Sequence, residues 1–352
     1  MENPNFYLYF AVILASFLLS TALVPLIRLY ARKNNIVDKP DAAARKVHEL
    51  PTPLLGGWVI FLATTISIVL IRYFHLADFS DIPLKLFIAI IFASIVIIIG
   101  GTLDDKYNLP PYQQIIFPIC AVIIVLVAGL HIGFITNPLG ESGSIIYIAK
   151  YFGIAISVLW LLGMMYTTKF LDGLDGLVSG IAVIASMFIF LVSLNWDKPL
   201  SATGIWALVL MGSCLGFLIF NWQPAKIFLG EGGSILIGFL LAVLSIITGS
   251  KITTTLLVMG IPALDVIWVI VSRLLSRKSP FSGDRKHLHY RLMALGLSKA
   301  QIVWLLYFIA IGFGSLGFIS SSYGKMILVF CLVAVMIILS TLLKVKAKTI
   351  QQ

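Results

Sequence analysis

The chain has 352 residues, of which 60% are hydrophobic and only 11% are charged, and it carries a formal net charge of +10. Soluble globular proteins are about half apolar and about a quarter charged, so this composition excludes an ordinary soluble protein and indicates an integral membrane protein. Because the lysines and arginines flank apolar segments, the positive charge indicates a membrane surface and not a nucleic-acid partner. The length leaves no room for a large soluble domain, so we expect a single transmembrane domain over residues 1–352.

Apolar runs of about 20 residues, the length that crosses a bilayer as a helix, recur along the chain. We therefore predict an all-α polytopic membrane protein with about eleven transmembrane helices. In chain order, the predicted spans are Phe6–Ile27, Gly57–Ile71, Leu84–Gly101, Gln113–Leu130, Tyr151–Met165, Val178–Leu194, Ile205–Phe220, Ser234–Ile247, Thr253–Leu274, Ile302–Phe318 and Met326–Leu343.

The basic residues also predict how these spans are oriented. With the N-terminus outside and the spans alternating, most of the 25 lysines and arginines fall on the cytoplasmic side, together with the C-terminus. Five polar segments fall on the same side, whereas the outer loops are chemically bland. This one-sided distribution favours an active site at the inner face over a channel or carrier, which keeps ionisable groups near the membrane midplane. The segments are Asp38–Gly57, Gly100–Tyr112, Thr167–Gly176, Asn221–Gly233 and Arg273–Lys299.

Two of these segments carry paired carboxylates. Asp104 and Asp105 are adjacent, and adjacent carboxylates repel each other unless a cation or a proton lies between them, so they are candidate ligands of Mg²⁺. Asp172 and Asp175 are three residues apart in a glycine-rich junction, a spacing that would put both on one face of a helix. A loop with helix caps would explain either pair without a ligand.

The segment NWQPAKIFLGEGGS combines an amide, an aromatic ring and an acid, namely Asn221, Phe228 and Glu231. A glycine-containing helix amino end is a ready phosphate site, Glu231 could bind a metal, and Phe228 could stack on a nucleotide base. The same residues also suit a turn between two helices in which Glu231 caps the second one.

The segment SGDRKHLHYR brings together Arg285, His287, His289 and Arg291. Such a cationic patch suits a pyrophosphate, and an anionic lipid headgroup is the alternative ligand. A zinc site is not expected, because no cysteine lies near.

Three other polar residues have two interpretations each. Lys46 and His48 precede a Pro-x-Pro turn, where they would form either a phosphate lid or ordinary flanking charge. Asp265 lies within the ninth predicted span, where a carboxylate costs about 2.5–3.5 kcal/mol on insertion scales, so it should face protein or water. We expect Asp265 either to orient a site residue or to pair with a basic side chain, and Pro262 to kink its helix.

Together these motifs resemble the polyprenyl-phosphate N-acetylhexosamine-1-phosphate transferases, glycosyltransferase family 4. The resemblance runs from about Asp38 to Leu292 in family order, and five motifs in order are far more specific than any one of them. The matching stretches are RKVHELPTPLLGG, GGTLDD, KFLDGLDGL, NWQPAKIFLGEGGS and SPFSGDRKHLHYRL.

The resemblance implies roles for the site residues. Asp104 and Asp105 would serve the metal and the attacking phosphate, and Glu231 would occupy a metal-ligand position. Asp172 and Asp175 would form the acidic loop on the nucleotide side. The other implied roles are a nucleotide amide for Asn221, uracil stacking for Phe228, phosphate handling for His287 and His289, and substrate binding for Lys46, His48, Arg285 and Arg291. We also expect Lys169, where the chain departs from the family, to bind substrate.

The resemblance also implies a reaction, a cofactor and a location. N-acetylhexosamine-1-phosphate would pass from a UDP-sugar to undecaprenyl phosphate, with release of UMP, at the cytoplasmic face of a bacterial inner membrane. Mg²⁺ would be the cofactor, with Mn²⁺ as an alternative, and the product would begin a cell-envelope polysaccharide. The expected partners are both substrates and membrane lipids, with no nucleic acid, and the sequence leaves open whether the chain forms a homodimer.

The stretch DRKHLHYRL is similar to the pattern of the N-acetylglucosaminyl-type members, so we expect UDP-GlcNAc as the donor. A phospho-N-acetylmuramoyl-pentapeptide transferase of peptidoglycan synthesis is the alternative enzyme. A transporter of lipid-linked substrates is the alternative from another class of protein.

Three residues depart from the family pattern. Lys169 stands where the family usually has Asn, Glu231 where it has Asp, and Tyr290 where it has a second His. We expect Lys169 and Glu231 to be coupled, with the ammonium group contacting either a phosphate or Glu231 itself.

Overall fold

The computed structural model describes residues 4–38, 51–140, 144–247, 252–275 and 287–350. These residues form fourteen helices and four short strands. The helices are α1 (Pro4–Lys33), α2 (Gly56–Tyr73), α3 (Leu84–Tyr107), α4 (Pro111–Gln114), α5 (Ile116–Val127), α6 (Lys150–Leu171), α7 (Leu177–Trp196), α8 (Ala202–Asn221), α9 (Gly230–Ile247), α10 (Ile252–Val258), α11 (Gly260–Leu275), α12 (Leu288–Ala294), α13 (Lys299–Ile319) and α14 (Ser322–Ile350). The strands are β1 (Val37–Asp38), β2 (Thr52–Pro53), β3 (Phe134–Thr136) and β4 (Ile145–Tyr147).

The short strands pair locally and were not predicted. β1 pairs antiparallel with β2, and β3 pairs antiparallel with β4. Strands of two or three residues leave no alternating pattern in a sequence. The β1–β2 pair nevertheless matters for the site, because it joins the segment that follows α1 to the segment that precedes α2.

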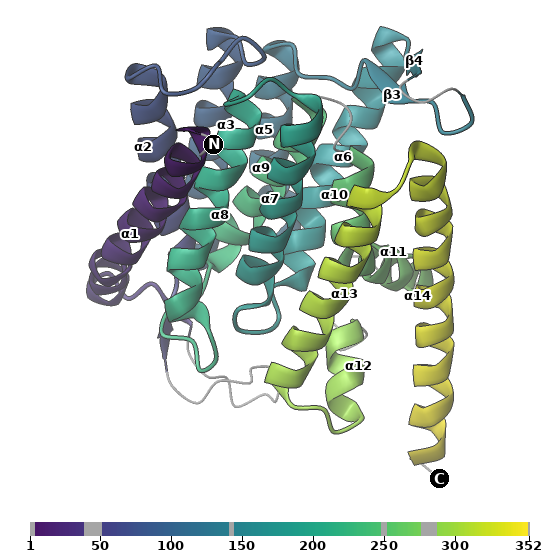
Figure 1. Cartoon of the computed structure of the whole chain (residues 1–352). Helices are drawn as coiled ribbons and strands as arrows, with labels where there is room; N and C mark the ends of the chain where they lie inside the picture. The colour runs from purple at the N-terminus through teal and green to yellow at the C-terminus, as the bar shows by residue number, and fades with distance from the viewer. Residues whose placement is uncertain (1–3, 39–50, 141–143, 248–251, 276–286, 351–352) are drawn as a thin grey trace.

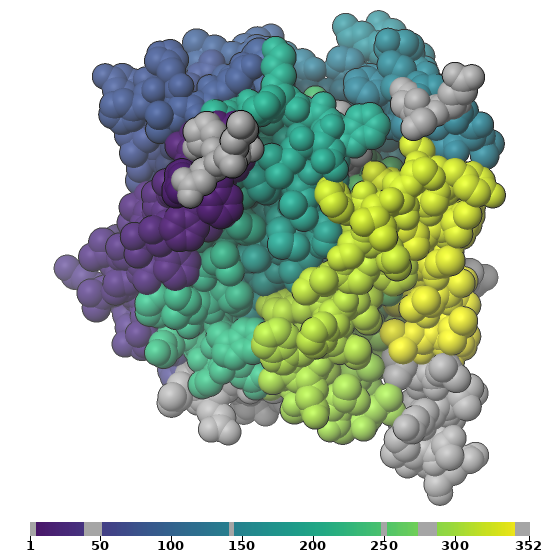
Figure 2. All heavy atoms as spheres, in the orientation of Figure 1, coloured from purple at the N-terminus to yellow at the C-terminus, as the bar shows by residue number. Residues whose placement is uncertain are grey.

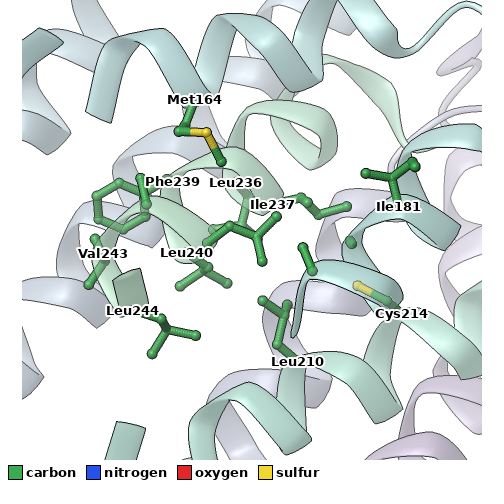
Figure 3. Close-up of a cluster of buried hydrophobic side chains, with 14 of the residues drawn as sticks. Met164, Ile181, Leu210, Cys214, Leu236, Ile237, Phe239, Leu240, Val243 and Leu244 are labelled. Carbon is green, nitrogen blue, oxygen red and sulfur yellow. The ribbon is translucent and has the colours of Figure 1, made fainter. Parts of the chain in front are cut away.

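The buried centre of the bundle is α9. Its apolar window is 89% buried, compared with 22% for α1 and 17% for α14. Leu236, Ile237 and Leu240 of α9 lie in one apolar cluster with side chains of α6, α7 and α8 (Figure 3). A helix that is apolar on every side is stable only inside a large core or a membrane protein, and α9 meets both conditions.

The outer helices keep apolar side chains on the surface. Phe10 and Leu18 of α1 and Phe330 and Ile338 of α14 are all more than half exposed. α1 runs along one side of the face drawn in Figure 2, and α13 and α14 run along the other, with α7 and α8 between them. Contiguous exposed apolar surface on this scale suits contact with lipid tails.

Nine helices of the described chain are long and apolar enough to cross a membrane, and the bent pair α10–α11 raises the number to ten. The predicted fourth span, Gln113–Leu130, falls on α4 and α5, whose combined stretch Pro111–Val127 is shorter than the other spans. The stretch Pro111–Val127 is preceded by Pro110 and followed, two residues on, by Gly129, which has a positive φ of 107°. Of the about eleven predicted spans, the described chain thus shows nine or ten as long apolar helices, and the fourth as a shorter apolar one.

The predicted ninth span is broken, because α10 and α11 meet at an angle of 75°. The break lies at Met259, between the two helices. Proline at position 262 has no N–H and its ring clashes with the carbonyl four residues earlier, at Val258, the last residue of α10. The predicted kink at Pro262 is thus confirmed, and its sharpness turns α11 aside from the direction of α10.

The polar segments gather at one end of the bundle. Figure 1 shows the N-terminus towards one end and the C-terminus at the other, and the α6–α7 turn, the α8–α9 connection and α12 all lie at the C-terminal end. Glycine contacts bring these elements close: a Cβ on Gly101 of α3 would lie 2.1 Å from the Cα of Gly232 in α9, and one on Gly57 of α2 would lie 2.5 Å from the Cα of Gly233. No side chain fits at either crossing, so α2 and α3 approach the amino end of α9 backbone to backbone.

Candidate active site

A cavity of about 740 Å³ opens at this end of the bundle. This volume lies within the usual range of pockets for small ligands, roughly 300–1,000 Å³. Among the described residues, six carboxylates and three lysines line it: Asp38, Asp104, Asp105, Asp172, Asp175, Glu231, Lys106, Lys169 and Lys299. The excess of acids over bases means that a bound phosphate compound needs further positive charge.

Asp104 and Asp105 lie in the last turn of α3 and point to different partners. Asp104 Oδ1 accepts hydrogen bonds from the backbone N–H of Leu109 at 2.8 Å and from Gln114 Nε2 at 3.1 Å. Asp105 Oδ1 accepts one from the backbone N–H of Glu231 at 3.0 Å. The adjacent acids thus have different hydrogen-bond partners, and Asp105 caps the positive amino end of α9.

Gly230 is needed for this cap. Its φ is +72°, and a Cβ at this position would lie 2.3 Å from Asp105 Oδ2. A residue with a side chain would therefore be strained and would push the carboxylate of Asp105 away from α9. The glycine next to Glu231 brings the α3 and α9 acids together.

Asp172 and Asp175 lie in the turn between α6 and α7, not on one helix, so the predicted shared helical face is wrong. Asp172 is the C-cap of α6, and Gly176, with a φ of +78°, is the N-cap of α7. Asp175 Oδ2 accepts a hydrogen bond from the backbone N–H of Ala225 at 3.1 Å. Both carboxylates still reach the cavity, because the turn itself forms part of its wall.

The environment of Asp172 favours its protonated form. Asp172 is exposed at its surface, but many protein atoms surround its carboxyl group. These atoms desolvate the charged form, which raises the pKa of Asp172 to about 8. The negative charges of Glu231 and Asp175 contribute in the same direction. A cation bound near Asp172 would lower this pKa again.

Asn221 holds two walls of the cavity together. Its Oδ1 accepts from the backbone N–H of Gly176 at 3.2 Å and from Ser179 Oγ at 2.9 Å, while its Nδ2 donates to the carbonyl of Ile227 at 3.0 Å. The amide lines the cavity, but both of its polar atoms already have partners in the protein.

Phe228 also lines the cavity, and its backbone is fixed on both sides. Its N–H donates to the carbonyl of Pro53 at 2.9 Å, and its carbonyl accepts from the N–H of Gly56 at 2.9 Å. The β1–β2 pair and the start of α2 therefore position Phe228 in the wall of the cavity that the acids of α3 and α9 also line.

Lys169 lies in the last turn of α6, against Glu231. Its Nζ is 3.1 Å from Glu231 Oε2, and it donates a hydrogen bond of 2.9 Å to Gln114 Oε1. Glu231 Oε2 is buried and accepts no other well-aligned hydrogen bond from the described residues. One of the two contacts expected for Lys169, the one with Glu231, is present.

α12 is fixed by a single carboxylate from the broken span. Asp265 of α11 is buried, and its Oδ2 lies 2.9 Å from His287 Nδ1. Its Oδ1 accepts from the backbone N–H of Leu288 at 2.9 Å and from Arg291 Nη2 at 3.4 Å. Both expectations for Asp265 are met, because it orients a candidate site residue and also pairs with a basic one.

The rings of His287 and His289 stack on each other outside the lining of the cavity. Their rings are 5.9 Å apart and nearly parallel, and Phe170 stacks on the other face of His287 at 5.8 Å. A Cβ on Gly173 would lie only 2.5 Å from His289 Nε2, so the ring of His289 packs against this glycine. Neither histidine lines the cavity, nor does Arg291, whereas Tyr290 does.

The chain matches known proteins along most of its length. Residues 87–249 match glycosyl transferase family 4. A Bacillus subtilis protein named "Probable undecaprenyl-phosphate N-acetylglucosaminyl 1-phosphate transferase" is 31% identical over 84% of this chain and 80% of its own length. The chain belongs to glycosyl transferase family 4. It is a multi-pass membrane enzyme, a phospho-sugar transferase of this family.

Other relatives carry related names. A Mycobacterium leprae protein named decaprenyl-phosphate N-acetylglucosaminephosphotransferase is 30% identical over 75% of this chain and 72% of its own length. A Thermotoga maritima undecaprenyl-phosphate alpha-N-acetylglucosaminyl 1-phosphate transferase is 29% identical over 87% of this chain and 89% of its own length.

The donor set of this transferase suits Mg²⁺. The ion prefers oxygen ligands and is usually held by one or two protein carboxylates together with substrate phosphates. Asp104, Asp105 and Glu231 supply such oxygens, and Glu231 Oε2 is paired with Lys169 Nζ without a well-aligned hydrogen bond from the described residues. Within the described residues, no three acidic, histidine or cysteine side chains are already gathered as a metal site. These residues fit an ion whose coordination is completed by the substrate.

Three candidate residues, Lys46, His48 and Arg285, lie outside the described residues of the transferase. Gln114 and Tyr290 are among the cavity residues that the sequence reasoning did not name as site residues. Gln114 bridges Asp104 and Lys169, but a glutamine beside a predicted span gives no signal by itself. Tyr290 was noted only as a departure from the family pattern, although that departure marked the α12 side chain that reaches the cavity.

The stability of the transferase should depend on pH through His289. Burial, reinforced by the charge of His287, lowers the pKa of His289 to about 4, below its ordinary 6.5. The unfolded chain therefore binds the extra proton between these values, and the free energy of unfolding falls as the pH drops from about 6.5 to about 4, by at most about 1.4 kcal/mol per pH unit.

The measurement is the melting temperature of the detergent-purified protein at pH 7 and pH 5. The wild type should melt lower at pH 5, and His289→Phe, which keeps a ring between His287 and Tyr290, should lose less on acidification. Equal losses in both proteins would contradict the assignment to His289.

Proposed function

We propose that this enzyme transfers N-acetylhexosamine-1-phosphate, preferably GlcNAc-1-phosphate, from a UDP-sugar to undecaprenyl phosphate and releases UMP. The observation that carries the proposal is the acidic cavity in which Asp104 and Asp105 of α3 meet Glu231 of α9 beside Lys169. The names of the relatives, which specify polyprenyl-phosphate and N-acetylglucosamine, support the choice of substrates. The product would enter a cell-envelope polysaccharide.

In the proposed reaction, an oxygen of the lipid phosphate attacks the β-phosphorus of the UDP-sugar. A new P–O bond forms to that phosphorus, and its bond to the oxygen shared with the α-phosphate breaks. UMP leaves with that oxygen and its electron pair, and a lipid pyrophosphoryl sugar remains. Catalysis of such a transfer consists mainly of positioning and electrostatic stabilisation, which an acid-lined cavity with an added cation supplies.

In this proposal, one group of cavity residues binds the metal ion and another binds the nucleotide. Mg²⁺, or alternatively Mn²⁺, held by Asp104, Asp105 and Glu231 would supply positive charge to the phosphates when bound. Asp172, Asp175 and Phe228 would receive the nucleotide, with Phe228 stacking on uracil. Asn221 would hold the α6–α7 turn and the α8–α9 connection in place through its hydrogen bonds with Gly176 and Ile227, and so fix the wall that receives the nucleotide.

The described side chain of α12 that lines the cavity is Tyr290, so we assign direct substrate contact there to Tyr290. The assignment of His287, His289 and Arg291 to the phosphates stays a prediction from the family resemblance. So do the substrate-binding roles of Lys46, His48 and Arg285.

We place the cavity at the cytoplasmic face of a bacterial inner membrane. The excess of lysine and arginine in the segments at this end supports that orientation, with the N-terminus outside. The single domain would then cross the membrane eleven times, with α5 as a short span and α10–α11 as a broken one. The lipid tail of the acceptor stays in the bilayer, which explains why the enzyme is embedded there.

The test is direct transfer. Purified full-length protein is incubated with Mg²⁺, undecaprenyl phosphate and labelled UDP-GlcNAc, UDP-GalNAc or UDP-MurNAc-pentapeptide, and butanol-extractable label and UMP are measured. We expect equal amounts of lipid-linked label and UMP from UDP-GlcNAc, and none without the lipid or with EDTA. No transfer from any donor would falsify the proposal, and preference for the pentapeptide donor would replace it by the peptidoglycan alternative.

A further inference from the structure

The ammonium group of Lys169, one of the lysines that line the cavity, is held on two sides. The side chain is only 13% exposed, with Glu231 Oε2 at 3.1 Å and Gln114 Oε1 at 2.9 Å. The ring of Tyr166, one turn earlier on α6, lies 5.9 Å from the same nitrogen. A buried ammonium group is costly unless it is paired, so these contacts fix its position.

Gln114 extends the influence of Lys169 to the α3 acids. Its amide oxygen accepts from Lys169, and its amide nitrogen donates to Asp104 Oδ1 at 3.1 Å and to the carbonyl of Leu109 at 2.8 Å. This is the orientation that the charges demand, because the opposite orientation would point N–H at an ammonium group and oxygen at a carboxylate. Lys169 thereby connects Glu231 of α9 with Asp104 of α3 through one amide.

We propose that Lys169 is a built-in counter-ion of the cavity, which keeps Glu231 and Asp104 together before a divalent ion binds and lowers the affinity for that ion. The inference rests on the proposed function, because it takes these two carboxylates as metal ligands. A divalent ion at Glu231 must share the carboxylate with Lys169 or displace its ammonium group.

The direction of the effect follows from charge. Two cations held by the same carboxylate repel each other, and partly buried charges are screened less by water than exposed ones. Removing the ammonium group should tighten divalent-ion binding by about tenfold or more, within the usual range of coupling between neighbouring sites. It should also leave the metal-free carboxylates unpaired, so the metal-free protein should melt lower and the stabilisation by added metal should grow.

The test measures binding, not turnover. Mn²⁺ is titrated into detergent-purified full-length protein without substrates, and free Mn²⁺ is followed by electron paramagnetic resonance. The variants are Lys169→Met, Lys169→Arg, which keeps the charge, and Lys106→Met, which removes a charge from the same cavity without touching Glu231. Glu231→Gln, alone and with Lys169→Met, completes a double-mutant cycle.

We expect tighter Mn²⁺ binding in Lys169→Met, affinity near the wild type in Lys169→Arg, and a smaller change in Lys106→Met. In the Glu231→Gln background, Lys169→Met should change the affinity much less. Unchanged affinity in Lys169→Met, or an equal gain in Lys106→Met, would overturn the inference while leaving the proposed function intact. No Mn²⁺ binding to any variant, together with no metal-dependent transfer, would contradict both.

If Lys169→Met does not fold, Lys169→Gln provides the second neutral variant, since its amide can still donate to Gln114. A lower melting temperature that Mn²⁺ does not restore would indicate a merely structural ion pair and would also overturn the inference.

Discussion

Asp105→Asn should reduce sugar-phosphate transfer about a thousandfold while the protein still folds. The asparagine Oδ1 can keep accepting the hydrogen bond from the backbone N–H of Glu231, so the crossing of α3 and α9 is preserved. The negative charge is lost, and phosphoryl transfer relies on charges positioned in a confined site, where removing one stabilising group costs about 10²–10³ in rate.

The measurement is kcat/KM for UDP-GlcNAc at saturating Mg²⁺ and undecaprenyl phosphate, with the melting temperature as a check on folding. Asp78→Asn is the matched control, because Asp78 does not line the cavity and, like Asp105, accepts a hydrogen bond from a backbone N–H, that of Ser80 at 2.9 Å, which an asparagine Oδ1 can also accept. A loss below tenfold in Asp105→Asn, with an unchanged melting temperature, would remove Asp105 from the catalytic group.

Asp265→Ala should destabilise the protein by about 3–5 kcal/mol, the usual cost of leaving one member of a buried charged pair without its partner. The change removes three contacts at once, with His287, the backbone N–H of Leu288 and Arg291. Transfer activity should fall as well, because Tyr290 reaches the cavity from the helix that these contacts hold.

Thermal unfolding in detergent and transfer assays measure both effects. Asp265→Asn is the matched variant, since it keeps an acceptor for Leu288 N–H but loses the charge opposite Arg291, and it should lose less stability than Asp265→Ala. A melting temperature of Asp265→Ala equal to that of the wild type would contradict the role of Asp265 as the anchor of α12.

Some parts of the fold were predictable because they leave a local pattern. Long apolar runs predicted the spans, since a bilayer requires about 20 apolar residues for each crossing. The run over Gln113–Leu130 misled this reasoning, because composition does not report that the helix formed there is short and interrupted. Pro262 was informative, because its missing N–H and its ring act on the helix directly.

The candidate site was predictable as a set of segments and less so as a set of contacts. Asp104, Asp105, Asp172, Asp175, Asn221, Phe228 and Glu231 all line one cavity, as the shared membrane face and the family resemblance suggested. The histidines at the start of α12 do not line the cavity, and the sequence did not reveal this. His287 precedes the helix as its N-cap in extended conformation, so helical spacing does not relate its direction to that of Tyr290. His287 is turned towards Asp265, and Tyr290 is turned towards the cavity.

The sequence by itself determined that this is a helical membrane protein, because its composition and its apolar runs are local properties of the chain. It also determined that the protein belongs with the polyprenyl-phosphate sugar transferases, because their motifs occur in order along it. Only the tertiary structure decided that Lys169 joins Glu231 and Gln114, and that Asp265 anchors α12. These contacts join helices far apart in sequence. They depend on glycine crossings such as Gly101 with Gly232 and on side-chain directions that only packing fixes.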